Sequence, residues 1–208
     1  STSGGDYTEG NAWQYTWHIQ HDVPGLIDLM GSADYFTAKL DSLFEMSSKK
    51  EGNGFVMDVT GLIGQYAHGN EPSHHIAYLY TLAGKPWKTQ KLLREICQTQ
   101  YQDKINGLCG NDDCGQMSAW YIFTNLGFYP VNPCGGEYVL GAPQLANATV
   151  ELANGKTFTV EALNFSKENL YVQSVELNGK PYSQTTINYA DIVNGGTLKF
   201  VMSNQPAK

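Results

Sequence analysis

The sequence contains no concentration of positive charge and no long apolar run. Its 13 Lys and Arg residues are outnumbered by 20 Asp and Glu residues, the net charge is -7, and no basic run is longer than Lys49-Lys50. Nucleic-acid binding depends on basic side chains that neutralise phosphates, so the composition argues against a nucleic-acid partner. No apolar stretch reaches the roughly 18 residues that a membrane-spanning helix needs, so we expect no membrane span.

We also expect neither a signal peptide in this chain nor a cysteine pair that binds metal or acts in redox chemistry. The first residues, Ser-Thr-Ser-Gly-Gly, lack the positive and apolar regions of a signal peptide, so we expect none in this chain. None of the four cysteines forms the C-x-x-C spacing of a metal or redox pair. Cys109 and Cys114 bracket a short loop whose length is compatible with a small disulfide and with two free thiols. Cysteine usage therefore favours neither an oxidising nor a reducing compartment.

Aromatic residues are plentiful by contrast. They make up 12% of the 208 residues, whereas charged residues make up only 16%. Such a composition suits flat, hydrogen-bonding ligands such as sugars packed against rings, and it suits an aromatic core equally well. The length is sufficient for one large domain or two small ones with a substantial core.

Apolar residues recur with helical spacing up to about Leu126. We expect helices joined by short loops, with Ser73 as an N-cap, Pro86 in a first turn and Gly127 at a helix end. A Gly-rich loop is expected over residues 52–54. Short loops indicate antiparallel helical hairpins. The expected helices span residues 9–20, 26–30, 34–46, 61–68, 73–84, 86–101 and 116–126.

The pattern changes to strands after Pro133. Asn154-Gly155 and Asn178-Gly179 separate alternating apolar segments and favour two-residue type I′ hairpin turns, and Asn194-Gly195 indicates a third turn. We therefore expect an α+β chain, with a helical array over residues 1–133 and a small antiparallel β-sandwich or sheet over residues 134–208.

Three segments carry more polar residues than a helical scaffold needs: residues 6–15, 68–75 and 109–116. Each lies at the amino-terminal end of a predicted helix. Alternate helix starts of an antiparallel array lie on the same side, so the three segments should converge at one mouth. Free N–H groups at helix starts favour carboxylates there.

Each acidic or imidazole group also has a structural explanation. Glu9 would favour a helix start, Glu71 would lie on the surface, Asp112-Asp113 would cap the next helix, and His74-His75 would be a hydrogen-bonded pair. The chemical alternative is a set of paired carboxylates, which are the working groups of glycoside hydrolysis.

Other chemistries are poorly supported. The spacing His68-x-x-Glu71-x-x-His74 is not a zinc-binding helix, because Gly69 and Pro72 interrupt it. The sequence also shows no calcium loop of the Asp-x-Asp-x-Asp-Gly type, no Gly-rich phosphate loop after a strand, and no nucleophile elbow.

Taken together, five ordered blocks resemble glycoside hydrolase family 92, the calcium-dependent exo-acting α-mannosidases, and the tail from Tyr138 to Met202 resembles the family's closing β segment. The resemblance covers essentially the whole chain. It implies part of an (α/α)6 barrel, about three helical hairpins, followed by the β domain. The blocks are Tyr7–Trp17, Gly69–His75, Gly84–Gln90, Gly110–Tyr121 and Leu126–Pro133.

The resemblance assigns roles to the acidic residues. Glu9 matches the family's general acid and Asp113 its base, in a single-displacement hydrolysis with inversion that separates the carboxyl groups by roughly 6.5–9.5 Å. Asp112 is a further candidate catalytic group. Many members carry an acid two residues before the base, where this chain has Asn111, and we expect Asn111 to bind substrate.

The resemblance also implies a calcium ion that bridges two mannose hydroxyls. Calcium prefers oxygen ligands, so Asp113 is the expected side-chain ligand, and His74 would contribute its backbone carbonyl. Members that cleave α-1,2 links carry a His-Glu pair where this chain has Asn70 and Glu71, and this departure leaves α-1,3 and α-1,4 open beside the favoured α-1,2. The expected substrate-binding residues are Trp13, Asn70, Glu71, His75 and Asn111.

The expected function is thus hydrolysis of terminal α-linked mannose from glycans, in the periplasm or outside a bacterial cell. Family members carry an amino-terminal β-sandwich and a complete barrel, so the missing amino-terminal part of its own chain is an expected partner. For the same reason the isolated chain should be nearly inactive. A non-catalytic sugar-binding or structural module is the alternative function, and a hydrolase that uses the same acids on another glycan is a third possibility.

Overall fold

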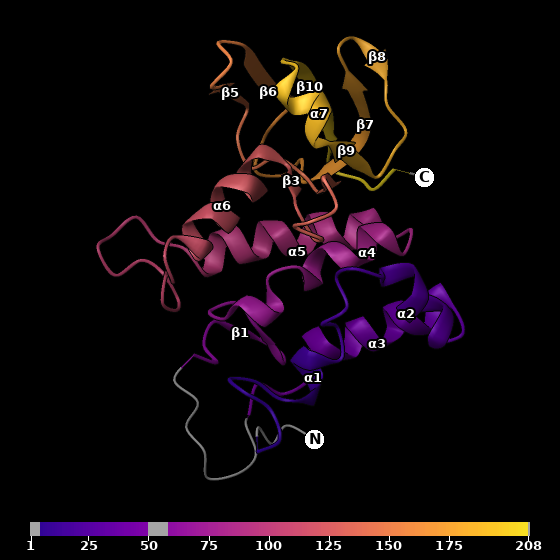
Figure 1. Cartoon of the computed structure of the whole chain (residues 1–208), viewed down its shortest axis with the longest axis vertical. Helices are drawn as coiled ribbons and strands as arrows, with labels where there is room; N and C mark the ends of the chain where they lie inside the picture. Colours follow the sequence, from indigo (N-terminus) through magenta and orange to yellow (C-terminus); the bar gives the residue numbers. More distant parts are fainter. Residues whose placement is uncertain (1–4, 50–57, 208) are drawn as a thin grey trace.

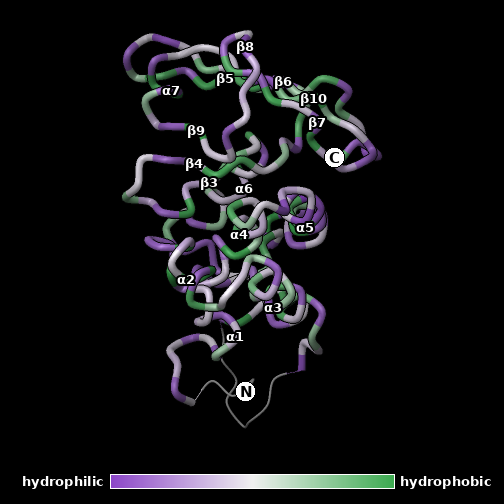
Figure 2. The backbone as a smooth tube through the Cα atoms, turned by 90° about the vertical axis from the view of Figure 1, so that its right-hand side faces the viewer, coloured by the Kyte–Doolittle hydropathy of each residue, from purple (hydrophilic) through white to green (hydrophobic). Residues whose placement is uncertain are grey.

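The computed structural model describes residues 5–49 and 58–207. Figure 1 shows the chain as stacked tiers, with α1 to α3 at the amino-terminal end, α4 to α6 in the middle and most of the strands at the carboxyl-terminal end. Figure 2 shows the same order after a quarter turn. The mixed α and β architecture expected from the sequence is confirmed, whereas the division at residue 133 stays a prediction.

Three helices have nearly the predicted bounds: α3 (Ala33–Glu45), α5 (Pro86–Thr99) and α6 (Gln116–Leu126). Their ends follow local chemistry. The hydroxyl of Ser32 accepts the N–H of Tyr35 at the start of α3, and Gly127 ends α6 at a φ of 90°. The shorter helices are α1 (Ala12–Tyr15), α2 (Val23–Leu29), α4 (Leu79–Leu82), α7 (Tyr189–Val193) and two 3₁₀ turns, η1 (Glu71–Ser73) and η2 (Ile76–Tyr78).

Four predicted local features were wrong. The helix expected over 9–20 is only α1, which starts after Asn11 in a capping box with Gln14 and ends at Tyr15. The helix expected over 61–68 is a hairpin of β1 (Leu62–Ile63) and β2 (Tyr66–Ala67). The helix expected over 73–84 is broken into the two 3₁₀ turns and α4. Ser73 does not cap it, since its hydroxyl accepts the N–H of Ala67 at 3.3 Å. The Gly-rich loop expected over 52–54 lies outside the described residues.

Two larger sheets form the carboxyl-terminal part. A five-stranded sheet has the order β5-β6-β10-β7-β8, and a three-stranded sheet has the order β3-β4-β9. All their pairs are antiparallel as predicted, except that β10 runs parallel to β6. Their strands are β3 (Phe128–Tyr129), β4 (Glu137–Leu140), β5 (Asn147–Glu151), β6 (Thr157–Leu163), β7 (Tyr171–Leu177), β8 (Lys180–Pro181), β9 (Thr186–Asn188) and β10 (Gly196–Ser203).

The three predicted turns have different outcomes. Asn178 and Gly179 both have positive φ, 52° and 74°, so the type I′ turn between β7 and β8 is confirmed. Between β5 and β6 only Gly155 has a positive φ, so the hairpin is present but its turn is not type I′. Asn194 follows α7 rather than joining two strands. The helix α7 therefore delivers β10 into the middle of the sheet, beside β6.

The described residues form two apolar cores. One joins the helices around side chains such as Trp17, Leu40 and Trp120, which are completely buried. The other lies against the five-stranded sheet around Phe158 and Phe200. Phe123 of α6 packs against both cores. Since α6 directly follows the polar segment 109–116, the same helix fixes that segment to both halves.

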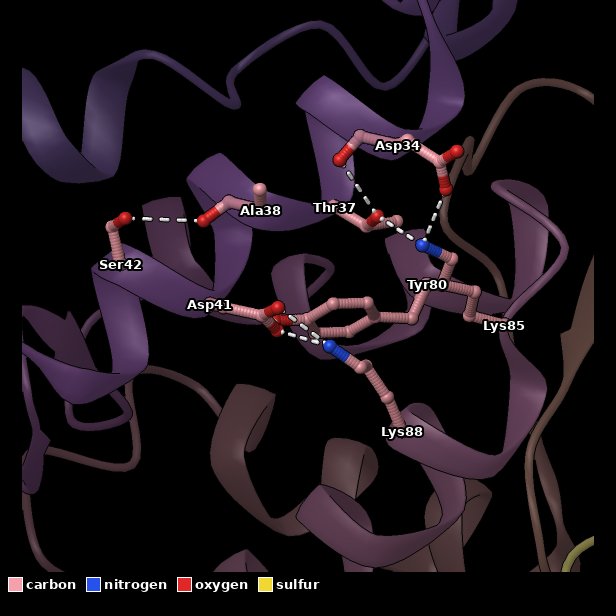
Figure 3. A network of polar contacts seen from close by, with 8 residues as sticks. All are labelled: Asp34, Thr37, Ala38, Asp41, Ser42, Tyr80, Lys85 and Lys88. Carbon is pink, nitrogen blue, oxygen red and sulfur yellow. Dashed lines mark hydrogen bonds and ion pairs between the residues drawn. The ribbon is translucent and has the colours of Figure 1, made fainter.

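Ion pairs hold α3 against α5 and the turn before it. Lys88 contacts both carboxylate oxygens of Asp41 at 2.6 Å, and Tyr80 donates to the same carboxylate at 2.8 Å. Lys85 bonds to Asp34 at 2.8 Å, beside Thr37 (Figure 3). No helix among residues 5–49 and 58–207 is long and apolar enough to cross a membrane.

Candidate functional site: a convergence of carboxyl groups

Carboxyl groups from all three polar segments lie close together. Burial raises the pKa of Glu71, and so do a hydrogen bond with Asp113 and the negative charges of Asp113 and Glu9. These effects require short distances between segments that are far apart in the chain. The influence of Glu9 and Asp113 on Glu71 agrees with a convergence of the three segments, and the catalytic roles of these residues stay predictions.

The acidic residues lie on an unusual backbone. Glu9, Asp113 and Cys114 have φ values of 52°, 44° and 59°, in the left-handed region that costs a non-glycine residue roughly 1–2 kcal/mol. Asn70 donates from Nδ2 to the carbonyl oxygen of Glu9 at 2.8 Å and so links the first two segments. Such backbone strain is typical of functional sites, where the surrounding structure maintains it.

A glycine pair allows the second and third segments to approach each other. A Cβ added to Gly110 would lie 2.6 Å from the Cα and from the carbonyl oxygen of Gly69. Any side chain at residue 110 would therefore push the two loops apart. Close backbone contact at this point brings the segment that carries Glu71 against the segment that carries Asp113.

The imidazole of His74 is neutral and fully engaged. Its Nε2 lies 2.9 Å from the carbonyl oxygen of His68, which can only accept, so Nε2 carries the proton. Its Nδ1 then accepts a hydrogen bond from Nε2 of Gln116 at 3.2 Å. Burial lowers the pKa of His74 to about 4. Both ring nitrogens are therefore occupied by hydrogen bonds. This agrees with the expectation that any metal ligand from His74 would be its backbone carbonyl oxygen.

His75 has the same arrangement. Its Nε2 donates to the carbonyl oxygen of Trp17 at 2.6 Å, and its Nδ1 accepts from Nε2 of Gln20 at 3.3 Å. Burial lowers its pKa to about 4 as well. His75 is 3% exposed, so it supports the site from beneath. The structural explanation given for the His74-His75 pair from the sequence agrees with these bonds.

Behind His74 lies a buried aromatic network. Tyr101 donates to the carbonyl oxygen of Met117 at 3.1 Å and therefore accepts from Nε2 of His68, so that Nδ1 of His68 accepts from Tyr66. Trp120 donates from Nε1 to the carbonyl oxygen of His74 at 2.9 Å, and this oxygen keeps a second lone pair. The network ties the segment 68–75 to α6.

The buried histidines make stability sensitive to acid. In the unfolded chain His74 and His75 have pKa values near 6.5, whereas burial lowers both to about 4 in the folded protein. The unfolded state therefore binds more protons between these values, and stability present above pH 6.5 is lost as pH falls toward 4. Each residue contributes about 3 kcal/mol to this loss. We expect urea unfolding midpoints to fall steadily over this range.

The variant His75→Gln isolates one of these contributions. Its stability should depend less steeply on pH between 6.5 and 4, by up to about 1.4 kcal/mol per pH unit. His21→Gln is the matched control, because His21 is exposed. An unchanged slope for His75→Gln would show that this imidazole titrates normally.

Asp112 has a different environment from Asp113. Its Oδ1 accepts the N–H of Ser118 at 2.9 Å, and both carboxylate oxygens lie 3.0 Å from the Ser118 hydroxyl. The carboxylate of Asp112 therefore satisfies a free N–H in the first turn of α6. This geometry favours the capping explanation for Asp112 over a catalytic one.

Two other predicted substrate-binding residues, Trp13 and Asn111, take no part in the hydrogen bonds described above for this site. Trp13 packs on the helical core with Lys39 Nζ 5.3 Å from the ring centre. Asn111 is exposed beside Asp112. The roles assigned to both stay predictions.

Sequence reasoning missed the two glutamines that hold the histidines. Gln116 opens α6 and bonds to His74 and Tyr129, while Gln20 follows α1 and bonds to His75. Gln116 was visible only as the first residue of a predicted helix. Gln20 gave no signal, because its partner is 55 residues away.

The donors present suit calcium in kind. The carboxylate oxygens of Glu71 and Asp113 are the ligands that calcium prefers, and the second lone pair of the His74 carbonyl is a further oxygen donor. Among residues 5–49 and 58–207, no group of three or more His, Cys, Asp or Glu side chains is arranged to hold a metal. Side chains of the described residues therefore supply only part of a calcium shell of six to eight ligands. All four cysteines are free thiols.

Comparison with known proteins gives consistent matches. The model of the glycosyl hydrolase family 92 catalytic domain matches residues 1–204. A family GH92 α-mannosidase of Bacteroides thetaiotaomicron, solved with mannoimidazole, is 46% identical and superposes with a TM-score of 0.92 over 97% of this chain. A family GH92 inverting mannosidase of the same species is 37% identical, with a TM-score of 0.82 over 96% of this chain.

An uncharacterized secreted glycosidase of Arthroderma benhamiae is 30% identical over 95% of this chain. The chain spans only part of each relative: 26% of the first structure, 28% of the second and 24% of the fungal protein.

Proposed function

The chain belongs to glycosyl hydrolase family 92, and we propose that it supplies the carboxyl-terminal part of the catalytic unit of an inverting α-mannosidase. The convergence of Glu9, Glu71 and Asp113 carries this proposal. Single-displacement hydrolysis of a glycoside requires one carboxylic acid and one carboxylate on opposite sides of the scissile bond. Two of the three acids are sufficient for that reaction, and the charge of the third affects the pKa values of the other two.

Glu9 is the proposed general acid. Its carboxyl group is exposed, and the hydrogen bond from Asn70 holds its backbone. Glu9 donates its proton to the glycosidic oxygen while the bond between that oxygen and the anomeric carbon breaks. The leaving glycan therefore departs as a neutral alcohol.

Asp113 is the proposed general base. Its carboxylate removes a proton from a water molecule, and the oxygen of that water forms the new bond to the anomeric carbon. Attack on the face opposite the leaving group converts an α-linked mannose into the β-anomer. The proton lost by Glu9 and the proton gained by Asp113 balance, and exchange with solvent restores both groups.

Glu71 is the third acidic residue, beside the proposed acid Glu9 and the proposed base Asp113. Burial, together with the neighbouring Asp113 and Glu9, raises the pKa of Glu71 above that of an ordinary glutamate. We also propose that Asn70 and Glu71 contact the leaving group and set the linkage preference, with α-1,2 favoured and α-1,3 or α-1,4 as alternatives.

Calcium is the proposed metal. Asp113, Glu71 and the carbonyl oxygen of His74 are the groups that would hold it, together with sugar hydroxyls and water. When bound, it would supply positive charge that clamps two mannose hydroxyls and favours a distorted ring.

We propose that this chain forms about half of an (α/α)6 barrel and that the rest of the catalytic unit completes the cleft. The exposed carboxyl groups of Glu9 and Asp113 agree with an incomplete wall. Water exclusion strengthens the interactions of catalytic charges, so the isolated chain should be nearly inactive. By analogy with the secreted fungal relative, we propose that the whole protein acts on glycans outside the cytoplasm.

The product anomer tests this function. The full-length protein should release β-mannose first from an α-mannobiose, as one-dimensional proton NMR would show before mutarotation, and a chelator should abolish the release while added calcium restores it. Initial release of α-mannose would contradict inversion. Full activity in the presence of a chelator would contradict the proposed requirement for calcium. Binding of mannose without hydrolysis would favour the alternative, a sugar-binding module.

A further inference from the structure

One hollow lies next to Glu71, and a second hollow adjoins the first. The near hollow, about 240 Å³, is lined by Glu71, the two buried histidines and Gln116. The distal hollow, about 220 Å³, lies between α2 and the strands β4 and β9. Gln20 and Val131 line both hollows. The two hollows therefore adjoin each other, with Glu71 lining the near one alone, and we call the pair of hollows the groove.

The size of each hollow limits what it can hold. Pockets for drug-sized ligands measure roughly 300–1,000 Å³, and each hollow is slightly smaller than that range. Each therefore suits one ring-sized unit. Because the hollows share a wall, two linked units can lie in the groove, one in each hollow.

The near hollow has hydrogen-bond acceptors in fixed positions. The Nδ1 atoms of His74 and His75 can only accept, so Gln116 and Gln20 must turn their amide NH₂ groups toward the rings. Their Oε1 atoms are then the atoms left for a ligand. Sugar hydroxyls are suitable donors for such oxygens. The buried histidines thus orient two acceptors at the wall of the groove.

The distal hollow adds a donor and a carboxylate. Oδ1 of Asn132 accepts the N–H of Cys134 at 3.1 Å, and no acceptor among residues 5–49 and 58–207 takes a hydrogen bond from its Nδ2. Glu137 is exposed at the same hollow, and the buried side chains of Val131 and Val139 form an apolar wall. Donors, acceptors and an apolar surface together suit the hydroxyls and C–H groups of a sugar.

We propose that the distal hollow binds the second sugar unit of the leaving group, so that the preferred substrate is a mannose-terminated oligosaccharide of at least three units. This inference rests on the proposed function. Removal of a terminal mannose at Glu9 and Asp113 requires the rest of the glycan to leave the cleft along an open path. The near hollow takes the unit next to the scissile bond, and the distal hollow takes the following one.

The test compares substrates of two lengths in the full-length protein. The wild-type protein should show a higher kcat/KM for an α-mannotriose than for the α-mannobiose of the same linkage. Asn132→Asp removes the Nδ2 donor and keeps the oxygen that accepts from Cys134. It should lower the ratio of the two kcat/KM values by roughly twofold to tenfold, as expected for one hydrogen bond. Asn147→Asp, at an exposed residue of β5, is the matched control and should leave the ratio as it is.

Binding provides a readout that does not need turnover. Calorimetry on an Asp113→Asn background should give a lower Kd for the mannotriose than for the mannobiose, and Asn132→Asp should remove the difference. Hydrolysis of both sugars with equal kcat/KM would overturn the inference and leave the proposed function in place. If no α-mannoside is hydrolysed, the proposed function is wrong, and equal Kd values for the two sugars would then overturn the inference as well.

Discussion

Glu9→Gln in the full-length protein is expected to lower kcat for an α-mannobiose by roughly 10²–10⁴, the usual contribution of a general acid. Gln has the same shape as Glu and cannot donate the proton that the leaving oxygen needs. The loss should shrink for an aryl mannoside with a very acidic phenol, because that leaving group departs without protonation. Steady-state kinetics with a series of aryl mannosides would measure the dependence.

Glu151→Gln is the matched control for this substitution, since Glu151 is exposed on the edge strand β5. It should leave kcat within twofold or so of the wild-type value, because surface substitutions away from a site have small effects. An equal loss for every leaving group in Glu9→Gln would show that Glu9 does not act as the acid. Glu71, whose pKa burial raises, would then be the next candidate.

Asp113→Asn is expected to lower kcat by a similar factor, roughly 10²–10⁴, and to do so equally for all leaving groups. The amide cannot remove a proton from the attacking water, and this step is needed whatever the leaving group. Azide needs no deprotonation, so it should restore turnover of an activated α-mannoside and give the β-mannosyl azide. NMR of the product would identify the anomer.

Asp112→Asn tests the neighbouring residue. Because Asp112 bonds to Ser118, this substitution should lower the free energy of unfolding by about 0.5–2 kcal/mol, as for other helix caps, with a smaller effect on kcat than Asp113→Asn. Azide rescue of Asp112→Asn, with no rescue of Asp113→Asn, would reverse the two roles. Urea unfolding of both variants would separate loss of structure from loss of chemistry.

Elements with strong local signals were predicted well. The helices α3, α5 and α6 have sustained apolar periodicity and clear end signals, such as Pro86 in the first turn of α5 and Gly127 after α6. The turn at Asn178-Gly179 is set by two residues that tolerate positive φ. In these elements the residues that decide the conformation are neighbours in the chain.

Short elements were predicted poorly, because distant contacts decide them. The hairpin of β1 and β2 was interpreted as a helix, yet the N–H of Gln65 in its turn donates to the carbonyl oxygen of Leu43 at 2.8 Å, and its side chain donates to that of Ser47 at 2.6 Å. Likewise, the parallel pairing of β10 with β6 depends on the path of α7 between the two sheets. The spacing of apolar residues along a short segment does not indicate such distant partners.

The candidate site divides in the same way. The sequence by itself determined which carboxylates are present, that three polar segments should meet, and which family the motifs resemble. Only the tertiary structure decided that the pKa of Glu71 is raised beside Asp113 and Glu9, that Asp112 turns to Ser118, and that the His74-His75 pair stays neutral. The physical reason is that protonation and hydrogen bonding depend on burial and on partners tens of residues away, which exist only once the chain has folded.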